Sequence, residues 1–172
     1  MKRKTLLIII LTFTIFCFIV FLKGLSTSNV YIPKQAIDIK LLSFNTEQLF
    51  NENKISSNDL FIDDKIYILN IWSSWCLPCR TEHSILMKLS KNPLINIIGL
   101  NYKDNEKNAK KYINQFGNPY KVILTDKDGT ISIFLGAYGV PETLVIKNKK
   151  ILKKYVGPLN HNSIEEINLL LK

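Results

Sequence analysis

The stretch LNIWSSWCLPCRTEH, residues 69–83, constrains the fold of this chain more than any other segment. An apolar run rich in isoleucine, residues 65–72, leads into Cys76 and Cys79, and helical spacing of apolar residues follows directly. Such a run is typical of a buried central strand. Pro78 suits the first turn of a helix, because a missing N–H costs little there. The two cysteines are therefore expected at the turn where a strand passes into a helix.

Two cysteines separated by two residues occur in structural disulfides, in metal sites and in redox pairs. A disulfide closing so short a loop restrains the unfolded chain little. A tetrahedral zinc site needs four ligands, and outside the N-terminal segment the chain offers two cysteines and two histidines, His83 and His161, without zinc-finger spacing. A redox pair is therefore the preferred interpretation and no metal is expected. His83, four residues after Cys79, is predicted to lie on the same helix face.

The position of Cys76 at a helix start explains how it would react. Unpaired backbone N–H groups and the helix dipole would face its sulfur and favour the thiolate, which is the attacking species. Cys76 is expected at the first exposed turn. Cys79, one turn inside and more buried, can attack the resulting mixed disulfide. Trp75 is expected to shield one side of the pair, and Pro78 to stiffen the turn.

The rest of the chain alternates between strand and helix patterns. Strands are predicted over residues 94–101, 120–126, 141–146 and 151–157, and helices over 104–117 and 162–172, with a short strand within 37–44. In the two helices the residues predicted to face inward are Ala109, Tyr112, Ile113, Phe116, Ile164, Ile167, Leu170 and Leu171. Residues 45–65 are expected to form a loop with at most a helical turn near 47–50, and residues 131–139 are expected to be irregular. This order predicts an α/β fold around one central mixed sheet flanked by helices. A C-x-x-C at its first strand-to-helix turn is typical of thioredoxin-like redox proteins.

The N-terminus carries a separate signal. Residues 6–22 form a segment of 17 residues without charge, proline or glycine. This length is close to the roughly 20 apolar residues that span a bilayer. Basic residues before this segment favour a cytoplasmic N-terminus. We interpret residues 1–23 as an uncleaved membrane anchor, 24–36 as a linker and 37–172 as the domain. A cleaved secretion signal is the alternative, and both place the domain outside the cytoplasmic membrane. Cys17, inside the anchor, is assigned no function.

The net charge of +9 does not by itself indicate nucleic-acid binding. Several basic residues flank the anchor, and others are scattered around a predicted hairpin, as in Lys147, Lys149 and Lys150, without aromatic interleaving. A solvated basic face is expected, which can favour an anionic membrane or an acidic partner. No nucleic-acid partner is expected.

Several motifs together carry a family resemblance. LNIWSSWCLPCRTEH, followed by NYKD, GNPY and YGVPET, resembles the thioredoxin-like thiol:disulfide oxidoreductases of cytochrome c maturation, the CcmG/DsbE family, from residue 37 to 172. W-C-x-x-C-R is specific only to the fold, whereas the later motifs are more specific. Membrane-tethered thioredoxins of the TlpA and ResA kind match these later motifs less well.

The resemblance implies a membrane-anchored, monomeric reductase on the periplasmic side of a bacterial inner membrane. Its substrate would be oxidised apocytochrome c, whose haem-binding C-x-x-C-H must be a dithiol before haem is attached. Electrons would come from a membrane thiol transporter of the DsbD or CcdA type. No cofactor beyond the Cys76–Cys79 disulfide is implied, with Cys76 attacking and Cys79 resolving.

The resemblance also draws attention to residues around the pair. Pro141 stands where thioredoxin-like folds place a cis proline beside the active site, and Glu142 would then point near the sulfurs. Glu82, three residues after Cys79, would share its helix face, and a carboxylate there can shuttle protons. Asn70 stands where general thioredoxins have a buried aspartate, so acid–base work would fall to Glu82 and Glu142.

Other functions fit the same chemistry. One is a TlpA/ResA-like reductase of broader specificity, and another is a disulfide-forming oxidase, which normally carries a larger helical insertion than this chain has room for. A third is a tethered module that binds apocytochrome and whose redox activity is incidental.

Overall fold

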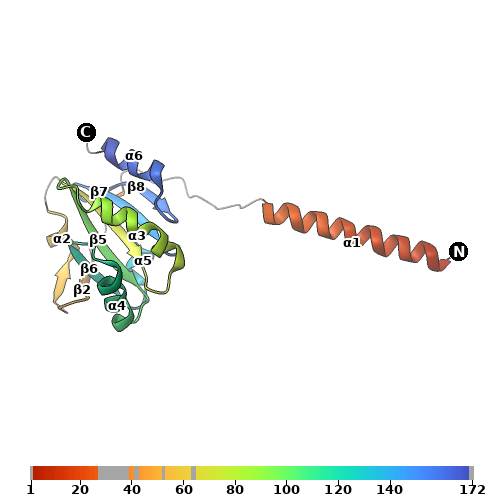
Figure 1. Ribbon diagram of the computed structural model, residues 1–172, viewed down its shortest axis with the longest axis horizontal. Coiled ribbons are helices and arrows are strands. Elements are labelled where there is room, and N and C mark those ends of the chain that lie inside the picture. Colours follow the sequence, from red (N-terminus) through yellow and green to blue (C-terminus); the bar gives the residue numbers. More distant parts are fainter. Residues whose placement is uncertain (1, 27–38, 41–42, 52, 63–64, 171–172) are drawn as a thin grey trace. The chain divides into compact units, whose positions relative to one another are not determined.

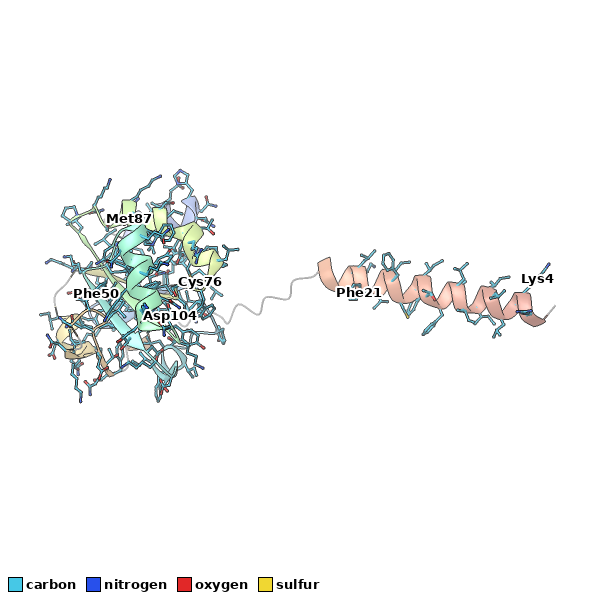
Figure 2. The ribbon with its side chains drawn as sticks, turned by 60° about the horizontal axis from the view of Figure 1, so that its bottom comes forward. Lys4, Phe21, Phe50, Cys76, Met87 and Asp104 are labelled. Carbon is cyan, nitrogen blue, oxygen red and sulfur yellow. A yellow bond between two sulfur atoms is a disulfide. The ribbon has the colours of Figure 1, made fainter. Side chains whose placement is uncertain are left out.

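The computed structural model describes residues 2–26, 39–40, 43–51, 53–62 and 65–170 (Figure 1). Two compact units divide the chain, residues 1–33 and 34–172, and each is described by itself. The first contains helix α1, Lys2–Ser26. Its segment Arg3–Lys23 has 21 residues and a mean hydropathy of 3.0, so it is long and apolar enough to cross a membrane. Figure 2 shows apolar side chains on all sides of this helix, as lipid contact requires.

The second unit is built on a six-stranded mixed sheet. Its strands are β1 (Ile39–Lys40), β4 (Ile66–Trp72), β5 (Ile95–Tyr102), β6 (Val122–Asp126), β7 (Glu142–Lys147) and β8 (Lys150–Val156). Their order across the sheet is β1-β8-β7-β4-β5-β6. β4, β5 and β6 run parallel, whereas β7 is antiparallel to both β4 and β8. Every residue of β4 is buried, which explains why its sequence is a continuous apolar run.

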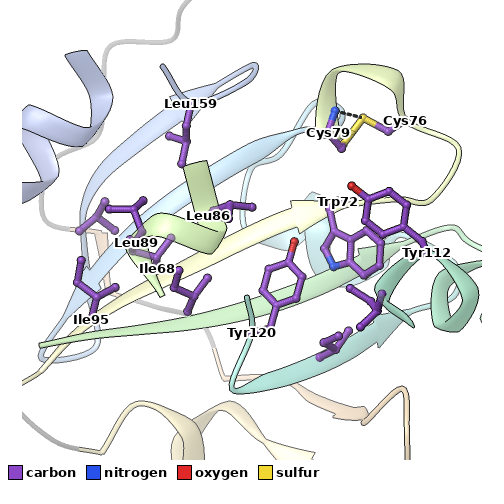
Figure 3. Close-up of a cluster of buried hydrophobic side chains, with 14 of the residues drawn as sticks. Ile68, Trp72, Cys76, Cys79, Leu86, Leu89, Ile95, Tyr112, Tyr120 and Leu159 are labelled. Carbon is purple, nitrogen blue, oxygen red and sulfur yellow. Dashed lines mark hydrogen bonds between the residues drawn. A yellow bond between two sulfur atoms is a disulfide. The ribbon is translucent and has the colours of Figure 1, made fainter. Parts of the chain in front are cut away.

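Helices α3 (Leu77–Leu89), α4 (Glu106–Phe116) and α6 (His161–Leu170) pack on one face of the sheet. α3 and α4 are consecutive crossovers between parallel strands, and right-handed crossovers in the same direction place their helices on the same face. Side chains of β4 and β5 that point to this face form one hydrophobic cluster with the three helices (Figure 3). The opposite face carries a second cluster, covered by α2 (Ser57–Leu60) and α5 (Thr130–Phe134). The predicted thioredoxin-like α/β fold is confirmed.

The prediction of a loop over residues 45–65 is wrong. Two short strands, β2 (Asn45–Glu47) and β3 (Lys54–Ser56), form a hairpin there, and α2 follows. The hairpin is docked on the edge of β6, because the Leu49 N–H donates to the Ile123 carbonyl (2.8 Å) and the Leu49 side chain is fully buried. Polar strands of three residues carry no periodic signal, so only this docking reveals them.

Two smaller expectations also need correction. Residues 131–139 were expected to be irregular, but α5 forms where the carboxylate of Asp126 accepts the N–H groups of Ile131 (3.1 Å) and Ser132 (2.8 Å). Phe116 was expected to be buried but is 45% exposed. It is the last residue of α4, which ends at Gly117 with a φ of 91°. In α6, Ile167 is buried as predicted, while Leu171 lies outside the described residues.

A candidate redox site at the start of helix α3

Cys76 and Cys79 form a disulfide at the N-terminus of α3 (Figure 3). Cys76 is the N-cap residue, and the backbone N–H of Cys79 donates to Cys76 Sγ at 3.1 Å. In the reduced protein, such a hydrogen bond and the helix dipole favour the thiolate form of Cys76. The expected difference in exposure is not found, because both cysteines are only 3% exposed and belong to the hydrophobic cluster beneath α3.

The loop between β4 and Cys76 is held by the segment after β5. Asp104 accepts hydrogen bonds from the Ser74 backbone N–H (2.5 Å) and hydroxyl (2.7 Å). Asn101 Nδ2 also donates to the Asp104 carboxylate at 2.9 Å, and the Ser73 hydroxyl donates to the Tyr102 carbonyl at 2.6 Å. Asp104 thus ties down the backbone two residues before Cys76. Asp104 lies in the NYKD motif, which contributes to the family resemblance, but no sequence pattern indicates this role.

The residues that flank the cysteines present an apolar surface. Trp75 is 57% exposed and its indole N–H donates to the Lys103 carbonyl at 3.1 Å. Leu77, directly after Cys76, is 73% exposed, and Pro78 is exposed in the first turn of α3. Exposed apolar side chains beside a reactive pair offer a contact surface for another protein.

Glu82 lies on the buried face of α3, one turn after Cys79, and is 1% exposed. Asn70 Nδ2 donates to Glu82 Oε1 at 2.9 Å, and the Leu159 N–H donates to Glu82 Oε2 at 2.8 Å. Burial raises the pKa of Glu82 to about 7, and these two hydrogen bonds oppose the rise only in part. A buried carboxyl group with a pKa near neutrality can take up and release a proton at physiological pH.

Asn70 and Tyr120 extend this buried polar cluster. The Tyr120 hydroxyl donates to Asn70 Oδ1 at 2.8 Å, and Asn70 Nδ2 also donates to the Thr143 hydroxyl at 3.0 Å. Tyr120 is 6% exposed and its ring stacks on Trp72 with 5.7 Å between centroids. The family resemblance draws attention to Asn70, whereas no sequence pattern points to Tyr120, although Tyr120 lies in the GNPY motif.

Pro141 follows a cis peptide bond from Val140, as the resemblance implies. The prediction that Glu142 points toward the sulfurs is wrong. Thr143 pairs with Asn70 on the face of α3, and because side chains alternate along a strand, Glu142 lies on the opposite face. Its carboxylate there accepts the N–H groups of Tyr138 and Gly139.

Glu142 also pairs with Lys154 Nζ at 2.7 Å while remaining 1% exposed. It therefore anchors the loop that precedes Pro141. A single-residue change in strand register reverses the face of every side chain, so the sequence alone could not place Glu142.

His83 faces helix α4. Its Nε2 lies 3.2 Å and 3.1 Å from the carbonyl oxygens of Phe116 and Gly117, and burial lowers its pKa. It therefore bridges the end of α4 to α3. Among the residues that the structure describes, no three His, Cys, Asp or Glu side chains gather closely enough to hold a metal ion.

The sequence of this chain is similar to those of known thiol:disulfide interchange proteins. Residues 40–170 match the Redoxin family. The thiol:disulfide interchange protein DsbE of Haemophilus influenzae is 37% identical over 93% of this chain and 90% of that protein. DsbE of Escherichia coli K12 is 38% identical over 72% of this chain and 66% of its own length.

Solved structures agree on the fold. A secreted thiol-disulfide isomerase from Corynebacterium glutamicum has a TM-score of 0.67 at 21% identity, covering 84% of this chain and 97% of that one. A secreted disulfide oxidoreductase of Mycobacterium tuberculosis has a TM-score of 0.62 at 19% identity, covering 74% and 93%. Taken with the cysteine pair at the start of α3, the sequence matches show that this chain is a thiol–disulfide oxidoreductase that belongs to the Redoxin family and, within it, to the DsbE-type thiol:disulfide interchange proteins.

Proposed function

We propose that this protein is an electron donor that reduces the disulfide of the haem-binding C-x-x-C-H of apocytochrome c. The observation that carries the proposal is the Cys76–Cys79 pair, set at a helix N-terminus in a chain that matches DsbE proteins along almost its whole length. The proposed catalytic residues are Cys76 and Cys79, with Glu82 as the proton-exchanging group.

In the reduced protein the Cys76 thiolate attacks one sulfur of the substrate disulfide. A bond forms between Cys76 and that sulfur, and the other substrate sulfur leaves as a thiolate and takes up a proton. The Cys79 thiol then loses its proton, for which Glu82 is the proposed acceptor, and attacks Cys76 Sγ. The second substrate sulfur leaves and is protonated, so two electrons have passed to the substrate and Cys76–Cys79 is a disulfide.

Two features support a protein substrate and a membrane location. Trp75 and Leu77 leave apolar surface beside the buried sulfur atoms, which a protein partner can cover. Helix α1 has the length and composition of a membrane anchor. We therefore place the domain on the periplasmic side of the inner membrane, acting as a monomer without a further cofactor, with a thiol transporter of the DsbD or CcdA type as its electron donor.

The test is capture of the substrate. In a Cys79→Ala variant the second attack cannot occur, so an oxidised apocytochrome c peptide containing C-x-x-C-H should accumulate as a mixed disulfide with Cys76. A Cys76→Ala variant, and a peptide with serines in place of its cysteines, are the matched controls. A Cys79→Ala protein that binds the peptide without any covalent adduct would make the chain a binding module instead.

The reduction potential of the wild-type pair separates donor from oxidant. A value well below that of protein disulfide isomerase, roughly −180 mV, is expected for a donor, whereas a value near about −120 mV would indicate a disulfide-forming oxidase. Equal rates with unrelated disulfide peptides would instead indicate a reductase of broad specificity.

A further inference from the structure

Tyr120 occupies an unusual place for a polar group. It precedes β6 in the GNPY motif and is buried against Trp72 (Figure 3). Its hydroxyl donates to Asn70 of the central strand β4. None of the chemical steps proposed above uses this hydroxyl. The donor–acceptor distance of 2.8 Å nevertheless makes it a well-formed hydrogen bond.

The hydrogen bond matters because a side-chain amide has two different ends. Its oxygen only accepts and its nitrogen only donates. With Tyr120 donating to Oδ1, the Nδ2 of Asn70 lies 2.9 Å from Glu82 Oε1. If the amide turned over, Oδ1 would face Glu82 Oε1, and two acceptors would meet unless Glu82 were protonated. The orientation of Asn70 and the protonation of Glu82 are therefore linked.

We propose that Tyr120 is a positioning residue for thiol–disulfide exchange, because its hydroxyl holds the Asn70 amide with the N–H toward Glu82 and so favours the ionised carboxylate. The inference rests on the proposed function, in which Glu82 exchanges a proton with Cys79. Tyr120 acts only through Asn70 and contacts neither sulfur nor substrate in this scheme.

Other titratable groups share this core layer. His83 comes from α3, Tyr112 from α4 and Tyr155 from β8, whereas Cys79 of α3 is held in the disulfide and does not titrate in the oxidised protein. Burial raises the pKa of Tyr112 and lowers that of His83, so both are neutral at pH 7. Arg80 and Glu82 both interact electrostatically with Tyr112, but because Tyr112 is uncharged at pH 7, replacing it with phenylalanine removes no charge from the surroundings of Glu82. The hydrogen bonds from Asn70 and Leu159 are the interactions that lower the pKa of Glu82 against the effect of burial.

The experiment measures the pKa of Glu82 directly, by carbon-13 NMR of its carboxyl group in the oxidised full-length protein in detergent. Tyr120→Phe keeps the ring and removes only the hydroxyl. Tyr112→Phe is the matched control, since Tyr112 packs on the same indole of Trp72 (5.3 Å between centroids). We expect Tyr120→Phe to raise the pKa of Glu82 by roughly half a unit to one unit, since part of a charge-assisted hydrogen bond is lost, and Tyr112→Phe to leave it unchanged.

A second pair of variants shows whether the effect passes through Asn70. In an Asn70→Ala background, Tyr120→Phe should no longer move the pKa of Glu82. If Tyr120→Phe leaves the pKa in the wild-type background unchanged, or shifts it equally in both backgrounds, the inference is overturned. Thermal unfolding of each variant identifies any that fail to fold. If Tyr120→Phe fails, Tyr120→Leu replaces it, because leucine is smaller than tyrosine and its side chain has no hydrogen-bond donor.

The outcome is independent of the substrate. Because the oxidised protein is titrated alone, an unshifted pKa refutes the role of Tyr120 even if apocytochrome peptide is captured by Cys79→Ala. Conversely, a shifted pKa without any capture would refute the proposed function and not the hydrogen-bond linkage. The reduction potential gives a functional readout. In Tyr120→Phe, the pH at which a plot of reduction potential against pH changes slope should rise together with the pKa of Glu82. In Tyr112→Phe this pH should not change.

Discussion

Asp104 accepts hydrogen bonds from both the backbone N–H and the hydroxyl of Ser74, two residues before Cys76. The two residues come from the loops that follow neighbouring parallel strands, β4 and β5. The carboxyl ends of parallel strands meet at one edge of a sheet, where sites commonly form. The redox loop is thus held by a carboxylate that lies 28 residues beyond Cys76 in the sequence.

Replacing Asp104 should therefore loosen the redox loop. An asparagine has one acceptor oxygen and no charge, so Asp104→Asn is expected to lower the free energy of unfolding by about 1–2 kcal/mol. Urea unfolding measures this loss, and Asp59→Asn is the control, since Asp59 is exposed in α2. Negligible changes in both variants would show that the hydrogen bonds between Asp104 and Ser74 do not contribute to stability.

Glu82 should make the protein less stable as the pH rises. Its pKa in the folded state, about 7, lies above the ordinary value of 4.5, so the folded protein binds the proton more tightly than the unfolded chain. Stability is therefore lost between about pH 4.5 and pH 7, by roughly 3 kcal/mol from this one group.

The variant Glu82→Gln has no such titration. As the pH rises through this window, we expect the unfolding free energy of the wild type to fall relative to that of Glu82→Gln. Urea unfolding at half-unit steps from pH 4 to pH 8 tests this. A difference that stays constant with pH would mean that the pKa of Glu82 is not raised.

Gly99 should not tolerate a side chain. It pairs with Asn70 across β4 and β5, and a Cβ there would lie 2.9 Å from Trp72 Nε1 and 3.1 Å from two ring atoms of Tyr120. Gly99→Ala is expected to destabilise the fold by about 1–3 kcal/mol through overpacking. Gly139→Ala, where a Cβ meets nothing within 4 Å, serves as the control in thermal unfolding. Comparable melting temperatures for both variants would contradict the close packing of Trp72 and Tyr120.

The hairpin of β2 and β3 should be an integral part of the domain. Leu49 is fully buried at its turn, whereas the next residue, Phe50, is 50% exposed. Leu49→Ala is expected to cost about 2–5 kcal/mol of unfolding free energy, and Phe50→Ala less than about 1 kcal/mol. Chemical denaturation measures both. If Leu49→Ala cost no more than Phe50→Ala, the hairpin would be an appendage that the core does not need.

The sequence by itself determined the local units. The apolar run of β4, Pro78 and the spacing of Cys76 and Cys79 predict a strand that passes into a helix with a redox pair at its start, because each signal lies within a few residues. Glu82 is a residue to which the family resemblance draws attention, and its spacing of three residues from Cys79 along a helix places it on the same face. Helices α3, α4 and α6 follow from the periodicity of their apolar residues, and strands β4 to β8 from short apolar runs and the turns between them.

Only the tertiary structure decided what distant segments do together. The face occupied by Glu142 depends on the register between β4 and β7, and a shift of one residue would reverse it. Asp104 and Tyr120 reach the site from other elements, through hydrogen bonds to Ser74 and Asn70. The hairpin of β2 and β3 exists because β6 has an open edge to pair with. Pairing, register and burial are properties of the assembled sheet, and no pattern within one segment specifies them.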